Sequence, residues 1–348
     1  MMKLEQIGFY TLTDQRAATA SQFSKLSRCE LLLTSRCNFR CPYCRQTGGP
    51  DIKMEDAKAI VSSWASHGLK AIRFSGGEPT LYCGLVELVA LAKREGIERI
   101  AISTNGSANP GLYTKLIAAG ANDFSVSLDA CCAEDGDRMA GVVKPSFHRV
   151  VETIKSLSTR VYTTVGVVLT QDNASQVGEI IRFADSLGVT DIRIIPAAQC
   201  DDRLRNVEIS SEMLAKYPIL QYRIDNVFAD RQVRGLTHQD PHQCGLVLDD
   251  MAICGNQHYP CIIYLREGGK AIGDVGDMAV MRGERQDWYE RHNTLLDPIC
   301  SRNCLDVCVD YNRKFAQFHN LTRGCLTGCT GVLVPQPVSS DSLVAIQT

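Results

Sequence analysis

The sequence predicts an α/β protein, a partial (β/α)6 barrel followed by a small cysteine-rich auxiliary cluster domain. Three observations lead to this fold class. Between about residues 30 and 205 the apolar periodicity switches repeatedly between two and about 3.6 residues, which is typical of alternating strands and helices. Six strand–helix units fit into this stretch, a number that favours parallel strands forming part of a barrel. Eight of the 16 cysteines then follow residue 243.

The first strand begins near Glu30 and leads directly into three cysteines with the spacing C-x3-C-x2-C, which are Cys37, Cys41 and Cys44. Three thiolates on one short loop can hold three irons of a cubane iron–sulfur cluster and leave the fourth iron open. A structural zinc site usually has a fourth ligand nearby, but here the nearest other cysteine, Cys29, precedes the strand. A zinc knuckle or a redox dithiol is the alternative interpretation.

The next three strands end in residues that suit ligand binding. Residues 70–75 run into Gly-Gly-Glu-Pro at 76–79, where glycines let the backbone approach a ligand and a carboxylate can bind a protonated amine. Residues 99–104 and 123–128 end in short polar side chains that could reach a ribose. The residues concerned are Gly76, Gly77, Glu78, Thr104, Asn105 and Ser127. Such residue types also suit a turn or a strand-end cap.

Two further strands, residues 161–169 and 191–195, complete the predicted barrel, and the second leads into Pro196. Helices are predicted between the strands because apolar residues recur there at helical spacing. These helices cover residues 54–67, 84–94, 111–119, 147–157 and 177–184. Active sites of barrels lie at the carboxyl ends of the strands, which is where the cysteine triplet and the polar residues fall.

The order of strand, cysteine triplet, helix and Gly-Gly-Glu-Pro resembles the radical S-adenosylmethionine (radical SAM) superfamily. Tyr43 stands where that family commonly carries an aromatic residue, directly before the third cysteine. The resemblance implies a [4Fe-4S] cluster on Cys37, Cys41 and Cys44, whose open iron is chelated by the amine and carboxylate of SAM. It also implies SAM contacts from Tyr43, Gly76, Gly77, Glu78, Thr104, Asn105, Ser127, Ile195 and Pro196.

The cysteine-rich segment has little hydrophobic periodicity, so bound metal would have to offset the entropy of ordering it. Its layout resembles the auxiliary cluster domains named SPASM and Twitch, although the spacing of its later cysteines departs from the SPASM pattern. The resemblance implies the cluster ligands Cys244, Cys261, Cys300, Cys304, Cys308, Cys325 and Cys329. We expect one auxiliary [4Fe-4S] cluster, and with Cys254 included the thiolates suffice for two. A zinc-binding tail is the alternative.

The resemblance implies reductive cleavage of SAM to a 5′-deoxyadenosyl radical, which takes a hydrogen atom from a substrate carbon. The substrate would be a small molecule, such as a sugar, nucleotide or aminocyclitol, or a peptide, and the auxiliary cluster would aid oxidation or epimerisation. Cys254 is a candidate hydrogen-atom donor. A flavodoxin- or ferredoxin-type protein is the expected electron donor.

Two alternatives stay open. One is a SPASM enzyme that modifies ribosomally made peptides, although the 28 residues before the first strand are too few for a leader-binding winged-helix domain. The other is a non-catalytic zinc or iron–sulfur binding protein. The intact triplet and the polar strand ends favour an enzyme over the second alternative.

Composition is consistent with a cytoplasmic enzyme. The net charge is −2 and Lys and Arg are scattered, which leaves no footprint for nucleic acid. No run approaches the roughly 18 to 20 apolar residues of a membrane span, and the N-terminus lacks a signal pattern. The predicted organisation is an N-terminal extension (1–28), the barrel (29–205), a connecting segment (206–243), the auxiliary domain (244–332) and a tail (333–348). Charged residues of the connecting segment could face the substrate, but such residues more often lie on a solvated surface, which is the expectation here.

Overall fold

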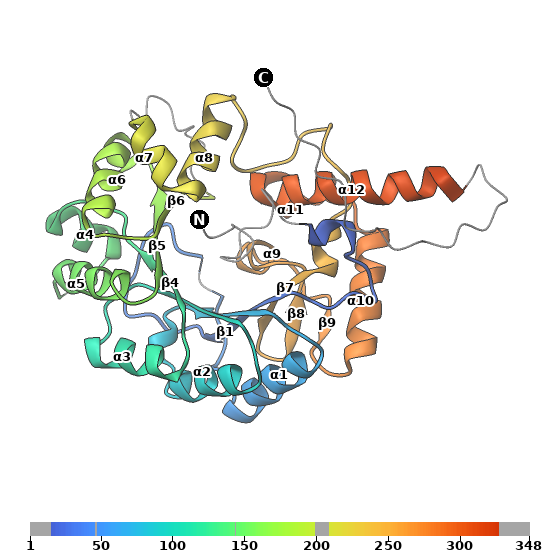
Figure 1. The fold of residues 1–348 in the computed structure, drawn as a ribbon, viewed down its shortest axis with the longest axis horizontal. Coiled ribbons are helices and arrows are strands. Elements are labelled where there is room, and N and C mark those ends of the chain that lie inside the picture. The colour runs from blue at the N-terminus through green and yellow to red at the C-terminus, as the bar shows by residue number, and fades with distance from the viewer. Residues whose placement is uncertain (1–14, 46, 143, 199–208, 327–348) are drawn as a thin grey trace, which may run out of the picture.

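The computed structural model of the chain describes residues 15–45, 47–142, 144–198 and 209–326, with side chains as far as residue 319. Nine strands form one sheet in the order β6-β5-β4-β3-β2-β1-β7-β8-β9. Figure 1 shows the first six strands curving around a central space, with helices on their outer side. The described part of the chain therefore confirms the predicted α/β partial barrel.

The six barrel strands run parallel, and each pairs with its neighbours in sequence. They are β1 (Arg28–Thr34), β2 (Ala71–Gly76), β3 (Arg99–Thr104), β4 (Asp123–Ser127), β5 (Tyr162–Leu169) and β6 (Asp191–Pro196). From β2 onward, each begins and ends within one residue of its predicted bounds. Because all six are parallel, their carboxyl ends lie on one side of the barrel.

The predicted barrel helices are also present, with bounds within two residues of those expected. They are α1 (Met54–Ser66), α2 (Leu85–Arg94), α3 (Pro110–Ala119), α5 (Phe147–Ser158) and α6 (Val177–Ser186). One further helix, α4 (Ala133–Ala140), is absent from the prediction because it is mostly polar and buries only Met139 and Ala140. Single turns of 3-10 helix are η2 (Arg16–Ala18), η3 (Pro79–Leu81), η4 (Ala174–Gln176) and η5 (Gly245–Leu248).

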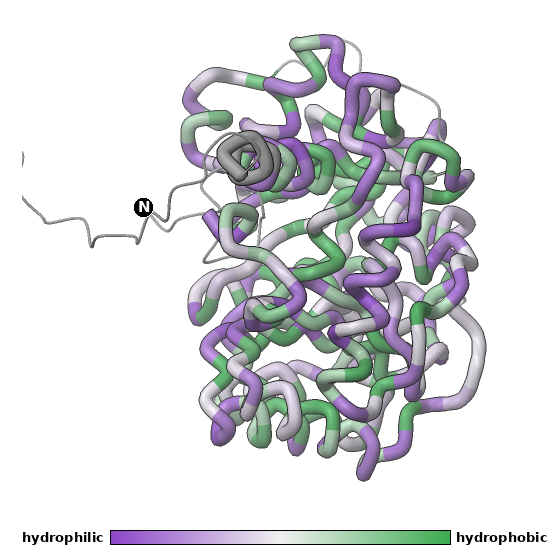
Figure 2. The backbone as a smooth tube through the Cα atoms, turned by 90° about the vertical axis from the view of Figure 1, so that its right-hand side faces the viewer, coloured by the Kyte–Doolittle hydropathy of each residue, from purple (hydrophilic) through white to green (hydrophobic). Residues whose placement is uncertain are grey.

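The two faces of the barrel sheet differ because side chains alternate along a strand. On the outer face, Phe74, Phe124 and Ile194 are fully buried within the apolar core shared with the helices. On the inner face, Glu30 of β1 lies beside Arg73 of β2. Figure 2 shows hydrophobic and hydrophilic stretches interspersed along the backbone. The interior of the barrel is therefore charged, unlike the packed apolar interior of a closed (β/α)8 barrel.

The cysteine-rich segment continues the same sheet. Its first strand, β7 (Asp250–Cys254), pairs in parallel with β1, and Arg28 lies opposite Asp250. β8 (Gln257–Tyr259) and β9 (Gly273–Asp274) follow in antiparallel pairing. The middle residues of β7 are almost completely buried, so this strand needs β1 beside it. The sheet thus runs without a break past residue 244, where the auxiliary domain was predicted to begin.

The remaining helices are α7 (Ser211–Lys216), α8 (Pro218–Phe228), α9 (Ile262–Arg266), α10 (Met278–Arg291), α11 (Pro298–Asn303) and α12 (Asp306–Leu326). Figure 1 shows α12 on the side of the molecule that carries β7, β8 and β9. None of the helices in the described ranges combines the length and the apolar character needed to cross a bilayer.

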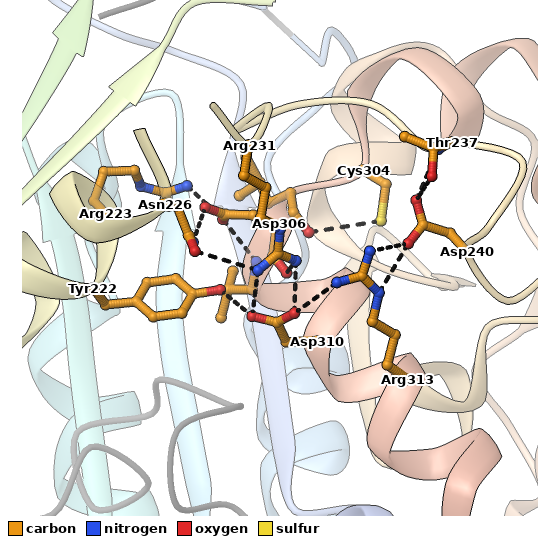
Figure 3. A network of polar contacts seen from close by, with 12 residues as sticks. Tyr222, Arg223, Asn226, Arg231, Thr237, Asp240, Cys304, Asp306, Asp310 and Arg313 are labelled. Carbon is orange, nitrogen blue, oxygen red and sulfur yellow. Dashed lines mark hydrogen bonds and ion pairs between the residues drawn. The ribbon is translucent and has the colours of Figure 1, made fainter. Parts of the chain in front are cut away.

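A buried polar network joins the connecting segment to α12 (Figure 3). Arg223 of α8 donates to Asp306 of α12, and the two side chains are 1% and 0% exposed. Asn226 donates to the other oxygen of Asp306 at 2.7 Å, and Arg231 pairs with Asp310 at 2.6 Å. The expectation that charged residues of this segment are solvated is therefore wrong for Arg223. Its burial follows from the packing of α8 on β6 and α12, and the Asp306 carboxylate neutralises its charge.

We expect Arg223→Ala to lower the free energy of unfolding by about 3–5 kcal/mol, because Asp306 would stay buried without its cation. Lys155→Ala, which breaks the exposed pair with Glu152, should cost less than about 1 kcal/mol. Anaerobic chemical denaturation followed by circular dichroism measures both changes. Equal losses in the two variants would contradict a structural role for the buried pair.

Candidate functional site

A cavity of about 420 Å³ lies at the carboxyl ends of the barrel strands. Cys37, Cys41 and Cys44 all line it. The predicted cofactor-binding residues that line it are Tyr43, Gly76, Gly77, Thr104, Asn105, Ser127 and Ile195. Glu78 and Pro196 are the two members of the predicted set that do not. The structure thus brings to one cavity residues that come from five different strand ends.

The loop after β1 presents three free thiols to this cavity. The amide of Cys44 donates to the carbonyl of Cys41 at 3.0 Å, and the amide of Phe39 donates to the Cys37 sulfur at 3.3 Å. Burial raises the pKa of Cys41 to about 12, and the neighbouring Cys44 and Cys37 add to this rise. A metal ion among the three sulfurs would favour the thiolate forms that these effects disfavour. The loop therefore offers three thiols to one cavity, the number that three irons of a cubane cluster need.

Tyr43 is held by a residue that sequence reasoning did not assign to the site. Its hydroxyl donates to Asp129 Oδ2, and the amide of Val168 donates to Asp129 Oδ1 at 2.7 Å. Burial raises the pKa of Asp129 to about 6, while these hydrogen bonds oppose that rise. Ser125, Ser127 and Asp129 are two residues apart, so the alternation of side chains along β4 places all three on the inner face. This spacing could have identified Asp129 from the sequence.

Glu78 lies behind the cavity wall, with 1% of its surface exposed. One carboxylate oxygen accepts from the hydroxyls of Thr80 and Thr104 at 2.6 and 2.8 Å, and the other accepts from the amide of Asn105 at 2.7 Å. Burial raises the pKa of Glu78, and the same hydrogen bonds lower it. In this arrangement the carboxylate fixes the end of β3 and its oxygens are occupied by the protein.

Gly76 and Gly77 are required by the close approach of two backbone segments. Gly76 has a φ of +145°, and a Cβ there would lie 2.2 Å from the carbonyl oxygen of Thr34. A Cβ on Gly77 would lie 2.4 Å from the carbonyl oxygen of Arg36. Any side chain at these positions would therefore push the turn after β2 away from the loop that carries the cysteines.

The end of β6 and the end of β7 carry the remaining predicted residues. Ile195 lines the cavity, whereas Pro196 is buried and its carbonyl oxygen accepts from Arg234 Nε at 2.8 Å. Cys254, the candidate hydrogen-atom donor, ends β7 and is half-buried, but it does not line the cavity. It interacts electrostatically with Arg266, which does line it.

Two arginines inside the barrel were not predicted as site residues. Arg193 donates to Ser125 Oγ at 3.2 Å, and its Nε is buried without a partner. The side chain of Arg73 makes no hydrogen bond or ion pair within the described ranges, and its Nε is buried as well. Burial, followed by repulsion from Arg73, lowers the pKa of Arg193 to about 10. Guanidinium groups whose buried Nε atoms have no partner suit an anionic ligand. The alternation of side chains along β2 and β6 places Arg73 and Arg193 on the inner face, and this pattern could have identified them from the sequence.

Five of the seven predicted auxiliary ligands line one further pocket. They are Cys244, Cys261, Cys300, Cys304 and Cys308. Its other walls are largely apolar and include Leu246, Tyr264 and Trp288. Burial raises the pKa of Cys244 to about 11, and a hydrogen bond with Cys308 together with burial raises the pKa of Cys304. The side chains of Cys325 and Cys329 lie outside the described part of the chain.

A small polar group borders this cysteine pocket. His292, Asp297 and Cys300 place one donor atom each within 4.8 Å of one another. Asp297 also begins α11, because its Oδ1 accepts from the amides of Ile299 and Cys300 at 2.8 Å each. Sequence reasoning missed His292 because it stands alone in the sequence, eight residues before Cys300.

The sequence of this chain is similar to a family model and to curated proteins. Residues 31–184 match the family model for the radical SAM superfamily. A probable GTP 3′,8-cyclase of Saccharolobus islandicus is 32% identical over 171 residues, which cover 47% of this chain and 55% of that protein. A probable GTP 3′,8-cyclase of Sulfurisphaera tokodaii is 27% identical over 201 residues, which cover 56% of this chain and 64% of that protein. The chain thus spans little more than half the length of these curated relatives.

Solved structures show the same fold. anSMEcpe with bound AdoMet superimposes with a TM-score of 0.55 at 13% identity, over 86% of this chain and 98% of that one. Streptococcus suis SuiB bound to S-adenosylmethionine gives a TM-score of 0.54 at 15% identity, over 77% of this chain and 64% of that one. The residues that match the family model also form most of the barrel, from β1 to α6, and they include the loop with the three cysteines. Residues 31–184, which form most of the barrel, are therefore similar in sequence to the radical SAM superfamily.

Proposed function

We propose that this chain is an enzyme that cleaves SAM reductively and abstracts a hydrogen atom from an anionic small molecule. The observation that carries the proposal is the meeting of Cys37, Cys41 and Cys44 with polar strand ends on one cavity. Three sulfur ligands would leave one iron of a [4Fe-4S] cluster open for the amine and carboxylate of SAM. The cluster would supply the electron that turns SAM into methionine and a 5′-deoxyadenosyl radical.

The protein would position the ligands and exclude water. Asp129 holds Tyr43, and thereby the cysteine loop, against the end of β4. Glu78 holds the hydroxyl of Thr104 and the amide of Asn105, so that the end of β3 keeps one shape. Met139 and Phe147 contribute apolar surface to the cavity, which would keep water from a radical. The predicted SAM contacts that line the cavity are part of this proposal, and Glu78 supports them from behind its wall.

The charge of the barrel interior supports an anionic substrate. Arg73 and Arg193 also line a smaller pocket of about 130 Å³ that shares lining residues with the main cavity. Its walls carry four arginines, the others being Arg28 and Arg223, against the three carboxylates of Glu30, Asp123 and Asp250. A pocket of this size admits a phosphate or carboxylate group but no folded peptide segment, which favours a small molecule over a peptide. The relatives named GTP 3′,8-cyclase suggest GTP as one member of this class, because its phosphates are anionic. A peptide with an acidic side chain is the second candidate.

The cysteine pocket supports an auxiliary cluster. Five thiols on one largely apolar pocket exceed the four ligands that one [4Fe-4S] cluster needs. We propose that four of them hold such a cluster and that it takes an electron from the substrate radical. A ferredoxin- or flavodoxin-type protein would reduce the cluster at the cavity.

Anaerobically purified protein should be brown, and with dithionite and SAM it should form 5′-deoxyadenosine. The triple variant Cys37→Ala, Cys41→Ala, Cys44→Ala should lose this product to background and keep about four irons per chain for one auxiliary cluster, or about eight for two. Cys83→Ala, an exposed cysteine elsewhere, is the matched control and should behave as the parent. Colourless protein that contains zinc would contradict the proposal.

Arg193→Gln should weaken the binding of GTP or pyrophosphate about 10- to 100-fold, because each charge-assisted hydrogen bond contributes about 1.5–3 kcal/mol. Arg94→Gln, on an exposed face of α2, should leave binding unchanged. Equilibrium dialysis with labelled ligands measures both. If guanosine binds as tightly as GTP and Arg193→Gln leaves the affinity unchanged, an anionic molecule is the wrong substrate class. The formation of 5′-deoxyadenosine tests SAM cleavage independently of this result.

A further inference from the structure

A short helix links the cysteine pocket to the SAM cavity. α9 begins directly after Cys261, whose sulfur accepts a hydrogen bond from the amide of Tyr264 at 3.4 Å. Ile263 lines both the cysteine pocket and the main cavity, so α9 forms the wall between them. Arg266, the last residue of the helix, also lines the main cavity. One turn of helix therefore separates a predicted auxiliary ligand from the predicted SAM site.

The far end of α9 contacts both loops that carry the family motifs. Arg266 Nη2 donates to the carbonyl oxygen of Gly76 at 3.0 Å, and its Nη1 donates to the carbonyl oxygen of Arg45 at 3.3 Å. Glu267, the next residue, pairs with the guanidinium of Arg45 at 3.5 Å. Because Arg45 directly follows Cys44, these contacts tie the cysteine loop and the Gly-Gly-Glu-Pro turn to one helix end.

The position of α9 depends on the cysteine pocket rather than on the helix itself. Five residues are far too few for a helix that is stable alone. Tyr264 holds the helix from the pocket side, since its hydroxyl donates to Asp297 Oδ2 at 3.1 Å and its ring packs edge-on against Trp288. Asp297 in turn caps the helix that carries Cys300. Whatever orders the cysteine pocket therefore also orders the helix that ends at Arg266.

We propose that Arg266 is a positioning residue that couples metal binding in the cysteine pocket to SAM binding in the barrel. The inference rests on the two metal sites of the proposed function. Metal bound to Cys261 and its neighbours would fix the start of α9 and thereby order Arg266. The entropic cost of ordering Arg266 would then be met by metal binding and would no longer reduce the affinity for SAM. SAM would consequently bind more tightly to protein whose cysteine pocket is filled.

The test is a double-mutant cycle on SAM affinity, measured by equilibrium dialysis and by the change that SAM causes in the electron paramagnetic resonance spectrum of the reduced protein. Cys300→Ala removes one of the five thiols and is expected to weaken metal binding in the pocket, which iron content checks, and Arg266→Gln removes the link. In protein with Arg266, we expect Cys300→Ala to weaken SAM binding about tenfold, within the usual range of coupling between sites. In the Arg266→Gln background, Cys300→Ala should change SAM affinity by less than about twofold.

The controls separate coupling from general damage. Arg291→Gln, at an exposed position in the last turn of α10, should leave the tenfold effect of Cys300→Ala intact. Cys244→Ala serves as a second pocket variant and should follow Cys300→Ala in both backgrounds. Circular dichroism and iron content establish that each variant is folded and that the pocket has lost metal.

Two results would overturn the coupling. If the effects of Arg266→Gln and Cys300→Ala simply multiply, Arg266 does not transmit the state of the pocket. If neither pocket variant changes SAM affinity, the two sites are independent. Both results leave SAM cleavage by the parent protein in place, whereas a parent protein without iron or SAM binding would overturn the proposed function together with the coupling.

Discussion

β1 is hydrogen-bonded on both edges, to β2 and to β7, and the loop with Cys37, Cys41 and Cys44 leaves directly from its end. This double pairing determines where everything else lies. The β2 side brings the Gly-Gly-Glu-Pro turn against the backbone of residues 34–36, at distances that leave no room for a side chain. The β7 side brings the cysteine-rich segment beside the same loop, so that both predicted metal sites are built around one strand.

The polar groups of the site fall into two kinds. Glu78 and Asp129 are buried carboxylates whose hydrogen bonds are made within the protein, and they hold the ends of β3 and β4 and the cysteine loop. Arg73 and Arg193 are half-buried cations whose Nε atoms are buried without a partner, although Arg193 also donates to Ser125. Desolvated charge that lacks a partner is unfavourable, so the chain retains it at a cost in stability. An anionic ligand that pairs with the two guanidinium groups would offset this cost, which is a reason for such groups to occur at a binding site.

The barrel strands could be predicted because their period and turn residues are local signals, and they appear within one residue of the expected bounds from β2 onward. α4 could not, because its polar sequence carries no apolar stripe. The pairing of β7 with β1, the burial of Arg223 and the meeting of Cys244 with Cys308 depend on contacts between residues far apart in sequence. The sequence therefore offered candidate cysteine ligands, but which of them share a pocket needed the folded chain.

The pairing of β1 with β7 has a consequence for the order in which the chain can fold. Ser27, at the start of β1, bonds to Asp249, at the start of β7, across 222 residues of sequence. A ribosome adds roughly 5–20 residues each second, so the outer edge of β1 stays unpaired for at least about ten seconds after that strand emerges. An exposed strand edge is a site for wrong pairing and aggregation. Assembly of the three-cysteine loop thus competes, in every newly made molecule, with association through the edge of the strand that carries it.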